Sequence, residues 1–496
     1  MGRIRPITKT REDFDYLIYK DGEYYKMLNG ESLSIEYKDQ DAATVIQRAA
    51  DEGKERQDAL IYLAPGLYPI SKPIIVKAKH PNSGAPSIIG IGHHINSVEF
   101  WQGWERARGV VLYPTPDFPI GRYLITYLPS DYTKDESVNG FELANLWLIG
   151  CTKNGNDLGE CRASGLGIRS ARDAWIHHIA IGYTRKATAE IESEMPFHPW
   201  CEGEAFCLYQ PTVMGGHVLV QNCSVTRSGQ AGGELQHGFR IDSTECYIIG
   251  CLALYNNGFN YVLGNPHQTM IACHSDVGYG DFKVYANSGT RIIGTETWGR
   301  PGYNSIRFDG GTYRNYTTFV NCRFNSPVSD GSEAERSVIW MNNNAAAEFI
   351  GCTFEIGDIS GSSVSHLFYA SSFWDGSVLF SNCRIINVDK ISGDLIVSAN
   401  GIVKINGLLA VKSDGTVLYS ENGGLATFSG DGSTTSFSIS HSLVQSPITY
   451  YVQKAVSGLP DIDYVEADAT NLTVHFKSAP ASGTDNVKLR WYASIS

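Results

Sequence analysis

The chain has 496 residues, of which 19% are charged, and it contains 51 glycines and 27 tyrosines. Its 52 acidic and 40 basic residues give a formal net charge of −12, which argues against binding to a phosphate backbone. No run of 18 apolar residues occurs, and the first residues lack the apolar region of a secretory signal. We therefore expect neither a nucleic-acid partner nor membrane insertion.

The N-terminal segment predicts a small β unit followed by one helix. Residues 13–38 contain three alternating runs separated by Asp21-Gly22 and Asn29-Gly30, which are strong hairpin signals. Asp41 is a good N-cap for an amphipathic helix over 42–51, with Gly53 beyond its end. We assign residues 1–40 to an N-terminal β module suited to anchoring, and we expect the helix to cover the open edge of the next strands in the chain.

The next segment carries a family resemblance. Residues 63–68 read Leu-Ala-Pro-Gly-Leu-Tyr, and they stand between the predicted helix and Gly90-Ile91-Gly92. This arrangement resembles the entry segment of the pectate-lyase-like superfamily, which includes polysaccharide lyases, glycoside hydrolases, epimerases and viral tailspikes. The resemblance implies a right-handed parallel β-helix over about residues 40–410, and it implies no single chemistry.

Seven of the 11 cysteines belong to one recurring sequence motif, in which an apolar residue and a small or polar residue precede the cysteine. They are Cys151, Cys223, Cys251, Cys273, Cys322, Cys352 and Cys383, with Ile179 and Thr295 as substitutes in two further copies. A repeat of two to four dozen residues indicates a solenoid, and each repeat holds about three short alternating strands. We therefore predict an all-β chain whose residues 41–424 form a single-stranded right-handed parallel β-helix of about ten turns.

The recurring cysteines are expected to be buried free thiols. Each would have two equivalent neighbours in adjacent turns, so no disulfide pairing is singled out, and a thiol suits an inward stack. One or two disulfide bonds between adjacent turns remain open.

The interval from Ile179 to Cys223 is longer than its neighbours, which indicates an insertion between Tyr183 and Cys207. The insertion is rich in acidic and aromatic residues: Glu190, Glu192, Glu194, Phe197, His198, Trp200, Cys201, Glu202 and Glu204. Insertions in solenoids gather on one face, which is often the binding face. One interpretation is a solvated acidic loop anchored by its aromatic residues. The other is a groove wall in which Glu202 is catalytic and Trp200 stacks on a sugar.

A second candidate site lies between residues 228 and 242. Glu234 and His237 precede a predicted strand, on which Arg240 and Asp242 share one face. The candidates are Glu234, His237 and Asp242 for catalysis and Arg240, Tyr255, Asn257 and His267 for substrate binding, with Asn256, Asn260, His274, Asp276 and Asp281 nearby.

Two chemistries fit these residue types. Glycoside hydrolysis needs two carboxyl groups, whereas β-elimination needs a base such as His237 or Tyr255, with Arg240 neutralising a uronate. The alternative is that these are ordinary polar groups on exposed turns.

We expect no metal ion and no cofactor. His93-His94 and His177-His178 are adjacent on strands, so the members of each pair should point to opposite faces. Trp101 and Trp104 are candidates for packing or for stacking on sugars.

The residue pattern changes in the last segment, residues 425–496. Ser- and Thr-rich alternation with Gly-Asp-Gly and Ser-Gly-Thr turns predicts a C-terminal β-sandwich. It resembles small C-terminal domains of tail-fibre and cell-surface proteins, which implies trimerisation or binding.

Together these features predict a tailspike-like virion surface protein that binds host cell-surface polysaccharide as a homotrimer, alongside other virion proteins. Whether it also cleaves the polysaccharide stays open, and its location would be the virion surface or the extracellular space. A stand-alone secreted polysaccharide lyase or glycoside hydrolase is the alternative. A purely structural virion component is the second alternative.

Overall fold

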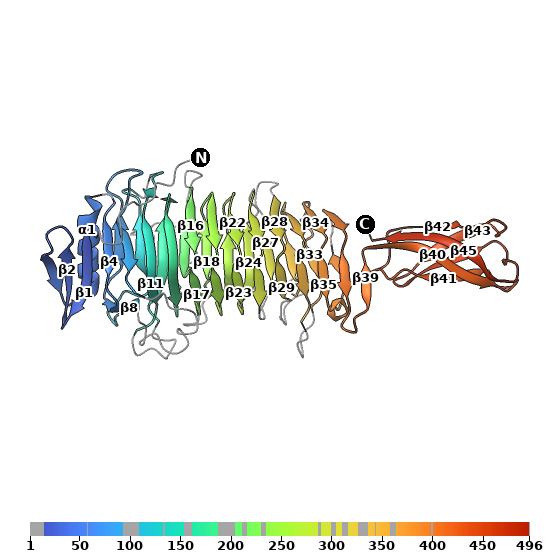
Figure 1. Cartoon of the computed structure of the whole chain (residues 1–496), viewed down its shortest axis with the longest axis horizontal. Coiled ribbons are helices and arrows are strands. Elements are labelled where there is room, and N and C mark those ends of the chain that lie inside the picture. Colours follow the sequence, from blue (N-terminus) through green and yellow to red (C-terminus); the bar gives the residue numbers. More distant parts are fainter. Residues whose placement is uncertain are drawn as a thin grey trace.

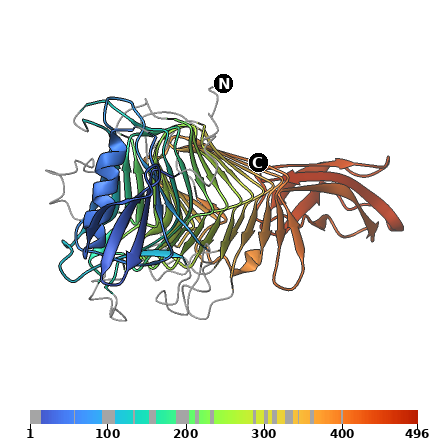
Figure 2. The ribbon, with the colours of Figure 1, turned by 60° about the vertical axis from the view of Figure 1, so that its left-hand side comes forward.

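A computed structural model shows the chain as a long rod (Figure 1). It describes residues 14–56, 58–92, 109–131, 134–152, 161–186, 204–210, 216–229, 235–285, 289–298, 304–309, 316–325, 336–342, 344–357, 364–397 and 400–495. A small β unit and one helix form the first end of the rod, and two antiparallel sheets form the other (Figures 1 and 2).

The N-terminal unit contains β1 (Tyr16–Asp21), β2 (Tyr24–Asn29), β3 (Ile35–Asp39) and α1 (Ala42–Lys54). The Asp41 side chain accepts hydrogen bonds from the backbone N–H groups of Ala43 and Thr44, which confirms the predicted N-cap. The helix extends through Gly53, so this glycine lies inside it and not beyond its end. A Cβ at Gly53 would lie 3.0 Å from Ala59, which explains the glycine by close packing.

The body of the rod is a stack of coils, and the predicted parallel β-helix is confirmed. Each coil contributes up to three strands that pair in parallel with the same strands of the next coil. β1 pairs in parallel with β4 and so joins the N-terminal unit to the first coil. α1 packs on β5 and β6 and covers that end of the stack (Figure 2).

The first two strands of the coils belong to one large sheet. The first strands are β4 (Leu60–Leu63), β7 (Ser87–Gly90), β11 (Glu142–Ile149), β14 (Trp175–Gly182), β16 (Val218–Gln221), β19 (Cys246–Ile249), β22 (Thr269–Ile271), β25 (Arg291–Ile293), β28 (Tyr316–Val320), β31 (Ala346–Ile350), β34 (Ser377–Ser381) and β37 (Ile402–Asn406). The second strands are β5 (Gly66–Ile70), β8 (Val110–Pro114), β17 (Ser224–Thr226), β20 (Leu252–Leu254), β23 (His274–Asp276), β26 (Glu296–Trp298), β29 (Arg323–Asn325), β32 (Thr353–Glu355), β35 (Arg384–Ile386) and β38 (Leu409–Val411); β11 and β14 span both positions.

The third strands form an 11-stranded parallel sheet, here called sheet B. They are β6 (Ile74–Lys77), β9 (Arg122–Leu128), β12 (Ala163–Arg169), β15 (Phe206–Tyr209), β18 (Phe239–Asp242), β21 (Phe259–Leu263), β24 (Gly280–Tyr285), β27 (Ile306–Asp309), β30 (Ile339–Met341), β33 (Phe368–Ala370) and β36 (Ile396–Val397). The remaining elements of the stack are β10 (Val138–Asn139), β13 (Ala171–Arg172), a 3-10 turn (Val388–Lys390) and β39 (Val417–Tyr419).

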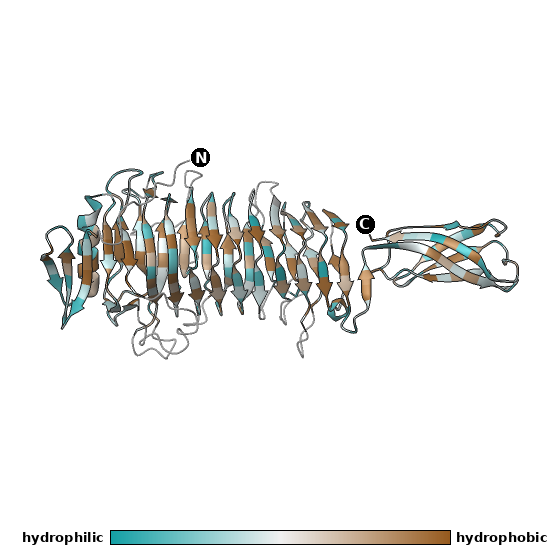
Figure 3. Ribbon diagram, viewed as in Figure 1, coloured by the Kyte–Doolittle hydropathy of each residue, from teal (hydrophilic) through white to brown (hydrophobic). Residues whose placement is uncertain are grey.

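The core lies inside the coils and repeats along the rod. Phe206, Phe239, Tyr261 and Phe282 occupy one inward column of sheet B, with successive ring centroids 5.2, 5.2 and 5.6 Å apart. Apolar residues run through the coils along the rod (Figure 3). Buried and partly exposed residues alternate along many coil strands, as in β16, β27 and β34. This follows from the strand period of two, because alternate side chains enter the core.

A left-handed residue joins the first and second strands of each coil from the third to the last. These residues have φ between +50° and +73°, and they are Asn145, His178, Asn222, Gly250, Ala272, Gly294, Asn321, Gly351, Asn382 and Gly407. Asparagine and glycine are the residues that adopt this conformation most readily. The small residue of the recurring sequence motif therefore forms the corner of the coil.

At some of these corners, an asparagine in one coil is followed by a glycine at the same position of the next coil, and the reason is steric. A Cβ at Gly351 would lie 2.5 Å from Asn321 Oδ1, and a Cβ at Gly250 would lie 2.6 Å from Asn222 Oδ1. Each asparagine side chain thus lies against the corner of the next coil. Only glycine fits at that corner, because it has no Cβ.

Replacing Gly351 with alanine should therefore destabilise the coil more than the same change at Gly294. Both positions are left-handed, which costs an alanine about 1–2 kcal/mol, but no atom lies within 4 Å of a Cβ at Gly294. Urea denaturation of the two variants measures the difference. Equal losses would show that Asn321 does not constrain its neighbour.

Six of the seven recurring cysteines form the predicted buried ladder. The thiols donate to carbonyl oxygens of the preceding coil, as Cys322 does to Ile292 at 3.3 Å and Cys383 to Phe349 at 3.2 Å. Burial raises the pKa of the Cys251 thiol well above its ordinary value, which keeps it protonated.

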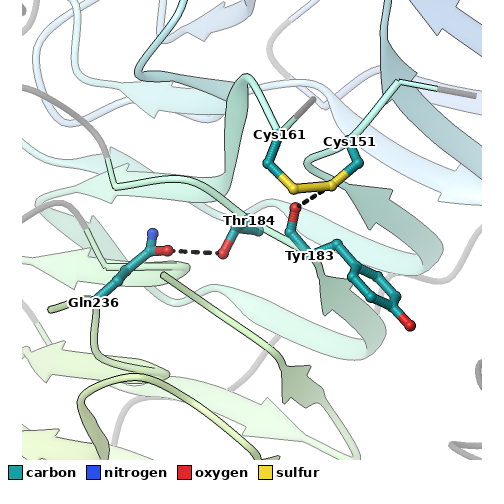
Figure 4. The surroundings of a disulfide bond; sticks show 5 residues. All are labelled: Cys151, Cys161, Tyr183, Thr184 and Gln236. Atoms are coloured by element: carbon teal, nitrogen blue, oxygen red, sulfur yellow. Dashed lines mark hydrogen bonds between the residues drawn. A yellow bond between two sulfur atoms is a disulfide. The ribbon is translucent and has the colours of Figure 1, made fainter. Parts of the chain in front are cut away.

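Cys151 does not belong to this ladder, and its inclusion in the repeat is wrong. The register places Leu146 beside Ile179, so Leu146 holds the equivalent position. Cys151 instead forms a disulfide bond with Cys161 (Figure 4). The Tyr183 carbonyl oxygen lies 3.1 Å from Cys151 Sγ, which is a contact without a hydrogen because a disulfide sulfur carries none.

The C-terminal unit contains two three-stranded antiparallel sheets. One sheet has β40 (Glu421–Gly430), β45 (Gly483–Ser494) and β42 (Thr449–Lys454), and the other has β41 (Ser436–Ser440), β44 (Asn471–Phe476) and β43 (Ile462–Ala467). Phe428 of the first sheet packs on Phe437 of the second, with ring centroids 5.2 Å apart. Among the described residues, no helix has the length and apolar character needed to cross a membrane.

Candidate functional site

The outer face of sheet B carries a charged and aromatic pattern that repeats from coil to coil. Its strands read Phe-Arg-Ile-Asp in β18, Phe-Lys-Val-Tyr at the end of β24 and Ile-Arg-Phe-Asp in β27, with the apolar residues inside. The polar and aromatic members face outward. We call the outward set Arg240, Asp242, Lys283, Tyr285, Arg307, Asp309 and Trp340 the cationic face.

Arg240 is the most buried member of this face. Its Nε donates to Asp242 Oδ2 at 2.6 Å, and its Nη1 donates to Glu204 Oε1 at 3.1 Å. The side chains of Arg240, Glu204 and Asp242 are 4%, 0% and 8% exposed. Arg240 thus neutralises two buried carboxylates, one of which belongs to the predicted insertion.

The next coils extend the face with partly exposed partners. Lys283 Nζ lies 3.4 Å from Asp309 Oδ2, and Arg307 Nε donates to Asp309 Oδ1 at 2.9 Å. The Arg307 guanidinium lies over the Trp340 ring, 4.4 Å from its centroid. Tyr285 contacts two cations, Arg240 at 5.7 Å and Lys283 at 5.1 Å from its ring centroid.

The coil between Arg240 and Lys283 contributes only small outward residues. Val262 pairs with both in register, and Gly264 follows β21. A Cβ at Gly264 would lie 1.5 Å from Asp242 Oδ1, so the Asp242 carboxylate occupies the space above this glycine. Because this coil presents no large outward side chain here, Arg240 can contact Tyr285 across it.

The predicted site residues separate into different places. Arg240 and Asp242 lie together on the cationic face, as their spacing predicts. The His237 ring is buried in the corner before β18, where Nδ1 accepts the Phe259 backbone N–H at 2.9 Å. This position favours a structural role for His237.

Tyr255 and Asn257 lie in the corner between β20 and β21. Tyr255 is exposed in a left-handed conformation, and Asn257 donates to the Gly229 carbonyl. His267 lies in the corner on the other side of sheet B, between β21 and β22, where a Cβ at Gly289 would lie 2.9 Å from its Nδ1. The coil therefore does not bring these three residues to Arg240.

Several predicted residues lie outside the described part of the chain: Glu234, Glu202, Trp200, Trp101, Trp104, His93, His94 and the insertion from Glu190 to His198. The end of the second loop is described. Gln236 Oε1 accepts from Thr184 Oγ1 at 3.0 Å, which ties this loop to the preceding coil (Figure 4).

The expected opposite orientation of His177 and His178 is wrong. His178 has φ +54°, which interrupts the alternation of the strand and brings the two Nδ1 atoms to 2.8 Å. His177 Nε2 also lies 2.8 Å from Glu142 Oε1. Within the described ranges, no group of three His, Cys, Asp or Glu residues is arranged to hold a metal ion.

The residues missed by the sequence interpretation are Lys283, Tyr285, Arg307, Asp309 and Trp340. The signal was present, because an outward charge or ring recurs two residues apart at the end of the third strand of several coils. It could have been found by aligning the coils on their third strands.

Comparisons with known proteins support the fold. A scan against models of protein families finds no match, and neither does a search of curated protein sequences. Among solved structures, DFA-IIIase from Arthrobacter chlorophenolicus A6 is 12% identical, with 73% of this chain and 90% of that chain covered and a TM-score of 0.50. It is a right-handed β-helix, as this chain is.

Two viral structures are also similar. The tailspike protein gp49 from Pseudomonas phage LKA1 is 10% identical over 91% of this chain and 92% of that chain, with a TM-score of 0.48. ORF18 of Geobacillus virus E2 is 14% identical over 91% of this chain and 75% of that chain, with a TM-score of 0.44. At these identities the likeness concerns the fold.

Proposed function

We propose that this chain is a virion surface protein whose cationic face binds a host cell-surface polysaccharide. The observation that carries the proposal is the repeat of cations and aromatic rings over neighbouring coils of sheet B, from Arg240 to Trp340. A linear polymer fits such a repeat, because successive sugars can meet equivalent groups about 4.8 Å apart.

The chemistry of the face suits sugars. The flat rings of Trp340 and Tyr285 offer apolar surfaces for the C–H faces of sugars, while the N–H groups of Lys283 and Arg307 donate to hydroxyl or carboxylate oxygens. The parallel sheet beneath holds these groups rigidly, so little conformational entropy is lost on binding.

The virion role is supported by the shape of the chain and by its ends. A distinct β unit precedes the rod and two antiparallel sheets follow it, in the places where a fibre would carry its anchor and its trimerisation domain (Figure 1). We propose a homotrimer with polysaccharide and other virion proteins as partners. The disulfide bond of Cys151 agrees with an extracellular location.

Replacing Trp340 with alanine should weaken polysaccharide binding by about tenfold or more, because an aromatic anchor contributes strongly to a binding face. Affinity electrophoresis in gels containing purified bacterial capsular or O-chain polysaccharides measures the retardation. Tyr247→Ala is the matched control, since Tyr247 is an exposed ring on a first strand, away from sheet B. Equal weakening by both variants would contradict the assignment of the face.

The virion role and the oligomer have separate tests. Copurification with virions at a fixed ratio would exclude the stand-alone secreted enzyme, and light scattering that finds a monomer would exclude the trimer. If the protein is retarded in the gel but shortens no polysaccharide, the chain binds polysaccharide without cleaving it.

A further inference from the structure

A second outward surface combines carboxylates with an exposed aromatic ring. It lies on the second strands of the coils, on β20, β23, β26 and β29, across a corner from sheet B. We call it the acidic-aromatic face, and its residues are Leu254, His274, Asp276, Glu296, Trp298 and Arg323.

The register places these residues in two neighbouring columns. Leu254, Asp276 and Trp298 are consecutive in one column, and His274, Glu296 and Arg323 are consecutive in the other. Trp298 is 53% exposed, and its ring lies 6.0 Å from that of His274. Asp276 thus lies between an aliphatic side chain and an open indole.

The two carboxyl groups of this face have opposite surroundings. Burial raises the pKa of Asp276, and the nearby His274 only partly offsets this effect. Within the described part of the chain, no cation lies within ion-pair distance of Asp276. Glu296 instead has the Arg323 guanidinium 3.3 Å away, so that a cation lies beside this carboxyl group. Two carboxyl groups with such different surroundings can act as the acid and the base of one site.

The spacing of the pair fits one type of glycosidase. Asp276 and Glu296 are one coil apart and two residues apart along the strand direction, so their Cα atoms are separated by about 8 Å. Both side chains face outward. Outward side chains on parallel strands keep their ends near the Cα spacing, and inverting hydrolases place their two carboxyl groups about 6.5–9.5 Å apart, which leaves room for a water molecule.

We propose that Asp276 and Glu296 are the acid and base of a glycoside hydrolase site that cleaves the polysaccharide bound by this chain, with Trp298 stacking on a sugar. This inference rests on the proposed function and adds a reaction and its residues. Tyr255, one of the predicted substrate-binding residues, lies at the edge of this face, where its backbone N–H donates to the Asp276 carbonyl.

The reaction needs only water besides the polysaccharide. Asp276 donates its proton to the glycosidic oxygen as the bond from C1 to that oxygen breaks. A water molecule attacks C1 from the opposite side and gives its proton to the Glu296 carboxylate. The products are a free hydroxyl group and a reducing end of inverted configuration, and proton exchange with solvent restores both carboxyl groups.

The rate should depend on pH in a bell-shaped manner, because Asp276 must be protonated and Glu296 must be charged. The groups that face Asp276 are His274 on its own strand, Leu254 on β20, and Glu296 and Trp298 on β26. From inside the coil, the Asp281 carboxyl interacts with it.

The test compares the wild-type chain with Asp276→Asn and Glu296→Gln on a fixed panel of purified bacterial capsular and O-chain polysaccharides. Affinity electrophoresis measures binding, and reducing-end release with size-exclusion chromatography measures cleavage. Glu348→Gln is the matched control, since this glutamate faces outward on β31, away from both faces. We expect both site variants to bind like the wild type and to cleave about 10²–10⁴-fold more slowly, with Glu348→Gln unchanged.

The outcomes separate the two proposals. A polysaccharide that is bound but not shortened by the wild type overturns the hydrolase site and leaves the binding function. No binding to any member of the panel overturns the binding function and the hydrolase site with it. Products with unsaturated absorbance at about 235 nm, as expected of β-elimination at a uronate, or equal cleavage by Asp276→Asn, would show that another chemistry or another site is at work.

Discussion

Replacing Arg240 with methionine is expected to lower the free energy of unfolding by about 3–5 kcal/mol, because it removes a cation that contacts two buried carboxylates. Glu204 is fully buried and Asp242 nearly so, and both contact Arg240 directly. Methionine keeps most of the volume and removes the charge, so the loss reports electrostatics more than packing. Urea denaturation at pH 7 measures it.

Arg307→Met is the matched control for this prediction. Arg307 lies in the same outward column, but its side chain is 33% exposed, and its ion pair with Asp309 should contribute only about 0–1 kcal/mol. Adding Glu204→Gln and Asp242→Asn to Arg240→Met should recover much of the loss. Equal losses for Arg240→Met and Arg307→Met would contradict the buried triad.

Asp281 is expected to make the stability of the rod fall as pH rises. Its carboxyl group is buried within the coil, where it accepts from Ser275 Oγ at 2.5 Å, and burial raises its pKa to about 7. The folded chain therefore holds this proton more tightly than the unfolded chain does. The associated stability is complete below about pH 3.8, decreases as pH rises through 7, and is lost at higher pH.

The size of this effect follows from the shift. The wild type should lose about 2–3 kcal/mol of unfolding free energy through Asp281 between pH 5 and pH 8. Asp281→Asn removes the titration and should flatten the pH dependence by that amount. Asp117→Asn, at an exposed turn, is the control and should leave the profile unchanged. A profile of Asp281→Asn that matches the wild type would contradict the assignment.

The fold could be predicted from local patterns because those patterns reflect the backbone directly. The period of two predicted strands, and the small residue before each ladder cysteine proved to be a left-handed corner, as at Asn321 and Gly351. The same local reasoning failed at His178, where the corner conformation reverses the expected direction of the side chain. It also failed at Cys151, whose spacing imitates the ladder by coincidence.

The candidate sites were only partly predictable, since they depend on which coils become neighbours. The sequence placed Arg240 and Asp242 on one face, because two residues along one strand suffice for that inference. It could not place Glu204 against Arg240, because Glu204 belongs to the insertion between Tyr183 and Cys207, whose path could not be predicted. Nor could it join Asp276 to Glu296 and Trp298, because the loop lengths between coils vary and set the register.

The sequence by itself determined that this chain is a stack of short strands with a buried thiol ladder, because strand alternation and the recurring cysteines can be recognised in the chain alone. Only the tertiary structure decided which outward residues lie together. The charged triad at Arg240, the cationic face and the acidic-aromatic face each bring together residues from different coils. Their neighbours are set by parallel register across the stack, which no local stretch of sequence contains.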